Sequence, residues 1–122
     1  MQLICLGLNH KTAPVEVREQ FSIPKAAIRQ GLANLDDYAG LDEVVVLSTC
    51  NRSEIYAVAG DAEDGLAEAK QFLFDLAGND DDIDDYLYTY LDEECIRHLF
   101  RVVSSLDSLV LGEGQILSQV KE

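Results

Sequence analysis

The sequence predicts an α+β domain of the ferredoxin-like, split βαβ type, with a four-stranded antiparallel sheet, helices covering one face and extra helices. Four short runs alternate apolar and polar residues or are continuously apolar, which is typical of strands. Between them, apolar residues recur at the three- and four-residue spacing of an amphipathic helix. The resulting order is strand, helix, strand, strand, helix, strand, helix, which is that of a split βαβ unit. Because this fold serves many unrelated functions, it identifies none by itself.

The N-terminal third predicts one strand and two helices. Residues 2–9 are apolar-rich and alternate, which indicates the first strand. Pro14 predicts a short helix over residues 15–20, because proline suits the first turn of a helix. Ser22 and Pro24 mark the start of a second helix, which apolar residues at helical spacing extend to about residue 36.

The middle of the chain predicts a hairpin. Residues 42–50 and 53–59 indicate the second and third strands, and only Asn51 and Arg52 lie between them. Two-residue connections are typical of hairpins, but the usual glycine is missing here, so the type of turn stays open.

A third helix is expected from a cap at Asp61 or Asp64 to about residue 76, ending at Gly78. The acidic stretch 79–85 is expected to be a solvated connection to the fourth strand, residues 86–91.

Asp92 is placed to cap a further helix. We expect a loop over residues 104–108 and the start of another helix at residues 116–122.

Composition limits the function classes. The 122 residues are 48% hydrophobic, enough for one domain with a core. The 23 acidic and 9 basic residues give a formal net charge of −14, so bulk electrostatics does not favour nucleic acid. Any RNA contact would need a local basic patch or another domain. Neither a signal peptide nor a membrane-spanning run is present, and the three cysteines have neither metal-ligand spacing nor a disulfide pattern. These observations predict a reduced, cytoplasmic protein without a metal site.

Cys50 is the candidate nucleophile. It comes where a buried apolar run stops, and Asn51 and Arg52 follow it directly. The thiolate is the nucleophilic form of cysteine, and cationic or hydrogen-bond-donating neighbours favour it. The alternative is that Cys50 only packs in the core, as free cysteines often do. Cys5 and Cys95 lie in apolar contexts and are expected to be core residues.

His98 is a second candidate. It lies at the edge of the apolar face of its predicted helix, beside Arg97 and Arg101. A histidine there suits general acid–base chemistry near neutral pH. The helix pattern alone favours a partly exposed interfacial histidine over this role.

Three motif blocks are similar to a known family. They are GLNHKTAP at residues 7–14, LSTCNRSE at 47–54, and a C-terminal block made of HLFRV at 98–102, LDSLVLGE at 106–113, QIL at 115–117 and QVK at 119–121. In order and spacing they resemble the N-terminal catalytic domain of the glutamyl-tRNA reductases. The chain departs from the family pattern in reading Val-Ser-Ser instead of Ala-Ser-Gly at residues 103–105, and Gly114 instead of proline.

The resemblance implies a reaction: NADPH-dependent reduction of glutamyl-tRNA to glutamate-1-semialdehyde, the first step of five-carbon tetrapyrrole biosynthesis. It implies that Cys50 forms a thioester with the glutamyl group and that His98 supports this step. Arg52 is the natural partner of the substrate carboxylate, because a guanidinium matches a carboxylate with two hydrogen bonds. The substrate-binding residues carried over from the family are Thr49, Asn51, Arg52, Ser108, Glu113, Gly114, Gln115 and Gln119.

The resemblance also implies an organisation. Residues 1–112 correspond to the catalytic, glutamate-recognition domain, and residues 113–122 begin a helix leading to an NADPH-binding domain that this chain lacks. The family forms homodimers through a further C-terminal domain, and glutamate-1-semialdehyde aminomutase is a candidate partner. No dinucleotide-binding fingerprint occurs in the sequence, so the chain alone is expected to be inactive as a reductase.

Two other interpretations stay open at this point. One is a cysteine hydrolase or acyltransferase that uses the same nucleophile without hydride chemistry. The other is a non-catalytic interaction module in which all three cysteines belong to the core.

Overall fold

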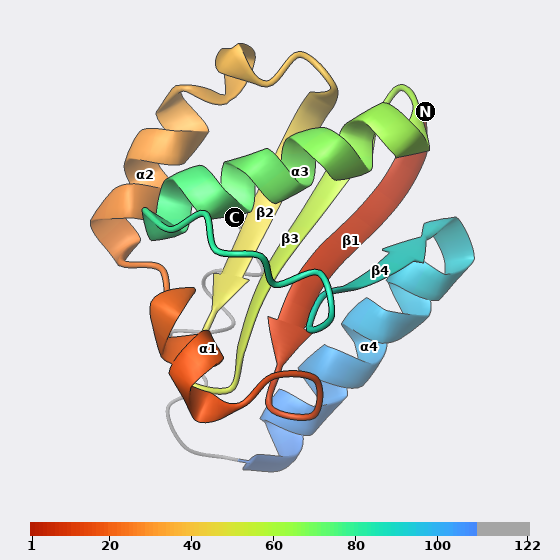
Figure 1. Cartoon of the computed structure of the whole chain (residues 1–122). Helices are drawn as coiled ribbons and strands as arrows, with labels where there is room; N and C mark the ends of the chain where they lie inside the picture. Colours follow the sequence, from red (N-terminus) through yellow and green to blue (C-terminus); the bar gives the residue numbers. More distant parts are fainter. Residues whose placement is uncertain (110–122) are drawn as a thin grey trace.

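A computed structural model of the chain describes residues 1–109, with side chains for residues 1–104. Its centre is a four-stranded antiparallel sheet in the order β2-β3-β1-β4, which is the strand order of the ferredoxin-like fold and confirms the predicted class (Figure 1). The strands are β1 (Gln2–Asn9), β2 (Leu41–Ser48), β3 (Arg52–Ala59) and β4 (Tyr88–Leu91).

The larger core lies between one face of the sheet and the helices that precede and follow the hairpin. Ile4, Leu6 and Leu8 of β1 point to this face and contact the buried face of α3 (Ala62–Ala77), including Phe72. Figure 1 shows α3 lying across the strands with α2 beside it. The helices α1 (Val15–Gln20) and α2 (Lys25–Ala33) and a 3₁₀ turn (Leu35–Asp37) complete this layer.

The last helix, α4 (Asp92–Leu109), lies on the opposite face of the sheet. Its residues Cys95 and Val102 form a second, smaller cluster with Cys5, Leu47 and Tyr56. The last three alternate along their strands with residues of the larger core, so they point to the opposite face. The expectation that helices cover one face only was therefore wrong. The element order alone does not decide on which side of β4 the following helix packs, whereas the apolar residues on both faces of β1 require a cover on each.

Most element bounds agree with the sequence predictions. β1 and α1 have the predicted bounds, and α3 begins and ends at the predicted signals. The Asp61 side chain accepts a hydrogen bond from the Asp64 backbone N–H, and Gly78 adopts a left-handed conformation with φ of 65°. Both are strong local signals, a side-chain cap and a residue without Cβ.

The C-terminal part differs from the prediction. The expected loop over residues 104–108 is absent, because α4 continues to Leu109. Asp92 begins the helix with φ of 48°, and its carboxylate accepts a hydrogen bond from the Leu3 backbone N–H at 3.1 Å, which ties the helix to β1. The boundary expected at residues 112/113 and the helix expected from residue 116 lie outside the described residues. Among the helices of residues 1–109, none has both the length and the apolar character needed to cross a bilayer.

Candidate active site

The turn between β2 and β3 carries Cys50. The Thr49 hydroxyl oxygen accepts hydrogen bonds from the backbone N–H groups of Asn51 and Arg52, at 3.1 and 3.2 Å. The Thr49 N–H in turn donates to the Arg52 carbonyl oxygen at 2.7 Å, which closes the turn. Within residues 1–109, the single non-glycine residue with positive φ is Asp92. The turn therefore needs no glycine. None of its residues has positive φ, and the hydrogen bonds to the Thr49 hydroxyl stabilise it instead.

Cys50 is exposed at this turn, whereas Cys5 and Cys95 are buried. The alternative in which Cys50 packs in the core is therefore wrong, and the core roles of the other two cysteines are confirmed. Burial raises the pKa of the Cys5 thiol far above its ordinary value and raises the pKa of Cys95 to about 11. Because reactivity needs an accessible thiolate, Cys50 is the cysteine suited to nucleophilic chemistry.

A buried carboxylate lies two residues beyond Arg52. Glu54 is 0% exposed and accepts hydrogen bonds from the hydroxyl groups of Tyr56, at 3.0 Å, and Tyr88, at 2.6 Å. A third hydrogen bond joins its Oε2 to Nε2 of His98, and Arg52 Nη1 lies 3.5 Å from Oε1. Glu54 thus connects β3, β4 and α4 at one point under the helix.

The surroundings of Glu54 keep it ionised. Burial alone would raise the pKa of the carboxyl, but the hydrogen bonds from His98 and Tyr88 and the positive charge of Arg52 outweigh it and hold the pKa below its ordinary value. The same burial and the negative charge of Glu54 raise the pKa of the Tyr56 and Tyr88 hydroxyl groups, so both remain protonated donors.

His98 is buried and enclosed by aromatic rings. Its ring stacks on Tyr90 with centroids 4.5 Å apart and meets Tyr88 edge-on at 5.2 Å. The interpretation of His98 as a partly exposed interfacial residue was therefore wrong. Among the described contacts its Nε2 binds Glu54 and no contact joins it to Cys50, so His98 is linked to the turn through Glu54 and Arg52.

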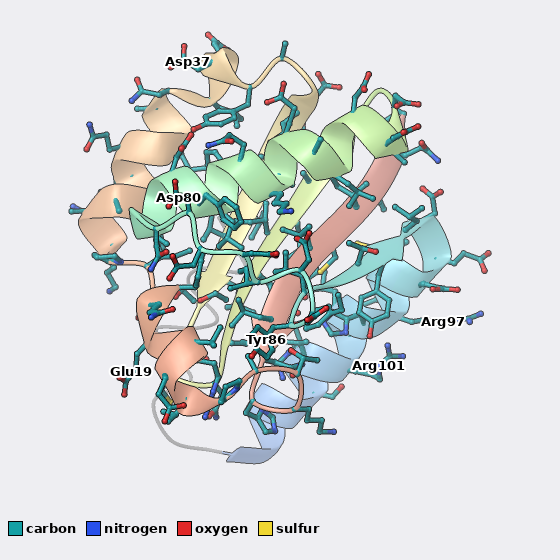
Figure 2. The ribbon with its side chains drawn as sticks, in the orientation of Figure 1. Glu19, Asp37, Asp80, Tyr86, Arg97 and Arg101 are labelled. Carbon is teal, nitrogen blue, oxygen red and sulfur yellow. The ribbon has the colours of Figure 1, made fainter. Side chains whose placement is uncertain are left out.

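The two arginines next to His98 in sequence point elsewhere. Figure 2 shows Arg97 and Arg101 projecting from α4 away from the sheet, and both are exposed. Arg97 lies 3.7 Å from Glu93 on the same helix. The expected grouping of these cations with His98 does not form, because the imidazole is buried under the helix whereas both arginine side chains are exposed to solvent.

The structure brings together half of the predicted site. Thr49, Cys50, Asn51 and Arg52 share the turn, and His98 lies on the neighbouring network. Ser108 belongs to the last turn of α4, and nothing is described of its side chain. The remaining predicted substrate-binding residues, Glu113, Gly114, Gln115 and Gln119, lie outside the described part of the chain.

Sequence reasoning missed Glu54 and Tyr88. The available signal was strand alternation: Glu54 falls on the same face of β3 as Tyr56 and directly before the apolar run of residues 55–59, an unusual place for a charge. Tyr88 and Tyr90 are two positions apart in β4, so both point to that face. Their meeting with His98 depends on the side to which α4 packs, which the sequence alone did not show.

One group of side chains in residues 1–104 has donors spaced as in a metal site. Cys5, Glu54 and His98 place their donor atoms within 4.8 Å of one another, and all three are buried. The two Glu54 oxygens already accept hydrogen bonds from two tyrosines and His98, and the pKa of the Cys5 thiol is raised. A metal would have to displace these bonds and deprotonate the thiol, so the donors fit a hydrogen-bonded core better than a metal centre.

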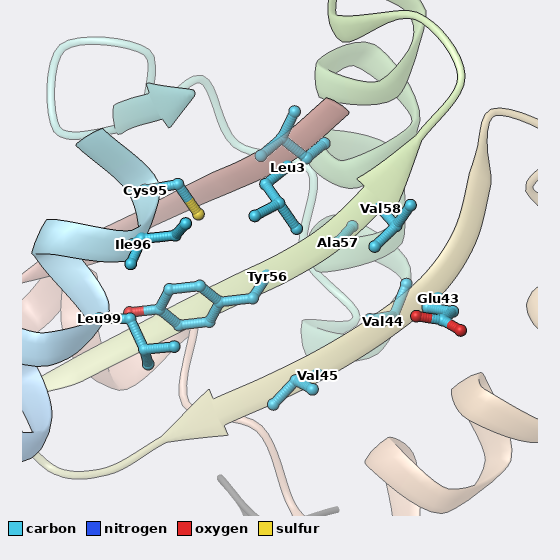
Figure 3. Close-up of a pocket in the computed structure, with 11 residues that line it drawn as sticks. Leu3, Glu43, Val44, Val45, Tyr56, Ala57, Val58, Cys95, Ile96 and Leu99 are labelled. Carbon is cyan, nitrogen blue, oxygen red and sulfur yellow. The ribbon is translucent and has the colours of Figure 1, made fainter. Parts of the chain in front are cut away.

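A separate apolar pocket opens beside the N-terminal half of α4 (Figure 3). Its volume is about 440 Å³. Apart from Glu43 its side chains are apolar, aromatic or sulfur-containing: Leu3, Ile4, Val44, Val45, Tyr56, Ala57, Val58, Cys95, Ile96 and Leu99. It contains none of Cys50, Arg52 and His98, so the pocket does not belong to the candidate active site.

Comparison with known proteins identifies the family. Residues 6–122 match the family described as "Glutamyl-tRNAGlu reductase, N-terminal domain". The chain belongs to this family. It is 51% identical to the glutamyl-tRNA reductase of Microcystis aeruginosa and 52% identical to that of Crocosphaera subtropica, in each case over 99% of this chain.

A solved structure agrees with this assignment. The glutamyl-tRNA reductase from Methanopyrus kandleri matches 98% of this chain with a TM-score of 0.64 and 32% identity. The chain spans 28% of the length of the two bacterial relatives and 26% of the solved chain. It therefore corresponds to the N-terminal part of a glutamyl-tRNA reductase.

Proposed function

We propose that this chain is the part of a glutamyl-tRNA reductase that binds the glutamyl group and forms a thioester with it on Cys50. The observation that carries the proposal is the turn itself. It presents an exposed thiol two residues from Arg52, whose guanidinium is held over a buried carboxylate. A nucleophile beside a carboxylate-binding cation suits an acyl substrate that bears a carboxylate.

The proposed step is a transesterification. The Cys50 thiolate attacks the carbonyl carbon of the glutamyl ester, a C–S bond forms, and the ester C–O bond to the terminal ribose breaks. The departing ribose oxygen takes up a proton, which releases free tRNA and leaves glutamyl-Cys50. A thioester carbonyl accepts hydride more readily than an ester carbonyl, because sulfur donates less electron density to it.

Arg52 is assigned to the substrate carboxylate. Its Nη1 is buried and has no hydrogen-bond partner in residues 1–104, although it lies 3.5 Å from Glu54. A buried donor without a partner costs about 1–3 kcal/mol. A carboxylate arriving beside Cys50 would supply the missing acceptor. The glutamyl group would also contact Thr49 and Asn51 of the same turn, together with Ser108, Glu113, Gly114, Gln115 and Gln119.

His98 is assigned a supporting role through Glu54. Because its Nε2 is bonded to the buried carboxylate, it holds Glu54 ionised and in place beneath Arg52.

NADPH does not fit the residues of this chain. The glycines of residues 112–115 lack the dinucleotide spacing, and the described sheet is antiparallel, without the parallel strand–helix–strand unit that binds dinucleotides. We therefore assign hydride delivery, dimerisation and any aminomutase contact to parts of the longer relatives outside this chain.

Mass spectrometry tests the proposal. The chain is mixed with glutamyl-tRNA, quenched in acid and digested. We expect a glutamyl adduct on the peptide that contains Cys50, no adduct in Cys50→Ser, and an unchanged adduct in the matched control Cys95→Ser. An adduct that persists in Cys50→Ser, or none in the wild type, would exclude thioester formation at this residue. Release of free glutamate without a detectable adduct would favour a hydrolase.

A further inference from the structure

A second arginine reaches the Cys50 turn from another element. Arg18 lies in α1, and its Nη1 donates to the Cys50 carbonyl oxygen at 3.3 Å and to Asn51 Oδ1 at 3.5 Å. Thirty-two residues separate Arg18 from Cys50 in the sequence, so the contact joins two distant parts of the chain. Arg18 therefore links α1 to the Cys50 turn.

The charge of Arg18 is not neutralised by this contact. Its hydrogen-bond partners are a carbonyl and an amide oxygen, and no carboxylate in residues 1–104 lies within ion-pair distance of it.

Arg18 also carries an unpaired donor. Its Nε is buried without a hydrogen-bond partner, and within residues 1–104 the only other such side-chain atom is Arg52 Nη1. Both unpaired donors are guanidinium nitrogens, and both arginines contact or belong to the turn of Cys50. Because buried donors are almost always paired, two exceptions at one place among residues 1–104 mark this turn as a site that can receive a further hydrogen-bond acceptor.

We propose that Arg18 is a second anion-recognition and positioning residue of the Cys50 site, one that fixes the turn and attracts an oxyanion of the substrate to the thiol. The inference rests on the proposed function for its substrate. That substrate offers two oxyanions, the glutamyl carboxylate and the phosphates of the tRNA acceptor end. Arg52 supplies one guanidinium group for binding an oxyanion at the Cys50 turn. Arg18 supplies a second guanidinium group from α1.

Alkylation of Cys50 by two reagents tests the charge without the substrate. Iodoacetate is anionic and iodoacetamide is neutral, so the ratio of their rates reports the local potential and cancels changes in thiolate fraction. Arg18→Gln should lower this ratio about threefold or more, since one charge close to the thiol is lost. Arg18→Lys should retain most of it. Arg29→Gln is the matched control: it removes the same charge from exposed α2 and should leave the ratio near the wild-type value.

Equal ratios for Arg18→Gln and Arg29→Gln would overturn the inference. Because no tRNA is used, this result is independent of whether Cys50 forms a thioester.

A second comparison identifies the oxyanion. Adduct formation is measured with glutamyl-tRNA and with the α-methyl ester of glutamate, which has the carboxylate but no phosphate. A loss of rate in Arg18→Gln with both substrates assigns Arg18 to the carboxylate, and a loss with tRNA alone assigns it to phosphate. Unchanged rates with both would show that Arg18 binds no part of the substrate and overturn the inference.

Discussion

The Glu54 side chain fits under α4 because Gly7, its partner across the β1–β3 ladder, has no side chain. A Cβ at position 7 would lie 2.8 Å from Glu54 Cγ and 2.7 Å from the Ser53 carbonyl oxygen. On its other side Gly7 pairs with Tyr88, so the space above the glycine is also the path by which the Tyr88 hydroxyl reaches Glu54. One glycine thus permits the hydrogen-bond network on which Arg52 and His98 depend.

Gly7→Ala should therefore destabilise the domain and weaken the site. The new methyl group would press on the backbone of β3 and on Glu54, and overpacking of this kind costs about 2 kcal/mol. Urea unfolding measures the loss. Gly60→Ala is the control, because a Cβ at Gly60 would meet nothing within 4 Å. Similar midpoints for the two variants would show that Gly7 is not needed to accommodate Glu54.

Glu54→Gln should change how stability depends on pH. The folded-state pKa of Glu54 is below the ordinary value of 4.5, so its contribution to the free energy of unfolding is full above pH 4.5 and is lost as the pH falls toward the folded-state pKa. The variant should be less stable by about 3 kcal/mol near neutral pH, because Arg52 and His98 lose their charged partner. The difference from wild type should shrink in acid.

Unfolding curves across this pH range give the comparison. Glu43→Gln serves as the control, since Glu43 is an exposed residue of β2. If the difference between wild type and Glu54→Gln were constant with pH, the carboxylate would not be the source of the stabilisation.

Local signals in the sequence were sufficient for much of the fold. The Asp61 cap, the left-handed Gly78 and the alternation of β1 each depend on a few neighbouring residues, and the elements they predict form as expected. The extension of α4 was missed because serines at 104 and 105 suggested a loop, although apolar residues continue at helical spacing.

The site was predictable in part. Cys50 and Arg52 are two positions apart in the sequence, so their common turn could be inferred from the end of one strand and the start of the next. Glu54 and Arg18 could not be found in this way. Their roles depend on α4 packing over the second face and on α1 reaching the hairpin, and both contacts join residues more than thirty positions apart.

Cys50 should be the first cysteine to react with iodoacetamide near neutral pH. It is exposed, whereas burial raises the pKa values of both Cys5 and Cys95 and shields their sulfur atoms. Intact-mass measurement should show a single modification, and peptide mapping should place it at Cys50. Cys50→Ser should then remain unmodified on the same time scale. Equal slow labelling of all three cysteines would instead favour a non-catalytic module.

Tyr88→Phe separates the hydrogen bond to Glu54 from aromatic packing around His98. The Tyr88 hydroxyl donates to Glu54 at 2.6 Å, and hydrogen bonds to charged groups are worth about 2 kcal/mol. Tyr90→Phe is the matched control, because Tyr90 stacks on the same imidazole and none of the described contacts joins its hydroxyl to Glu54. Tyr88→Phe should therefore lower the free energy of unfolding by about 2 kcal/mol, and Tyr90→Phe by less than about 0.5 kcal/mol.

Tyr88→Phe and Tyr90→Phe should also differ in how their free energies of unfolding depend on pH in acid. The bond from Tyr88 is one of the contacts that lower the pKa of Glu54, so its loss moves that pKa upward. Acid destabilisation runs from the unfolded-state pKa of Glu54 down to its folded-state pKa, so it should be smaller in Tyr88→Phe than in Tyr90→Phe and should level off at a higher pH. Coincident pH profiles would mean that His98 and Arg52 suffice to keep the carboxylate ionised.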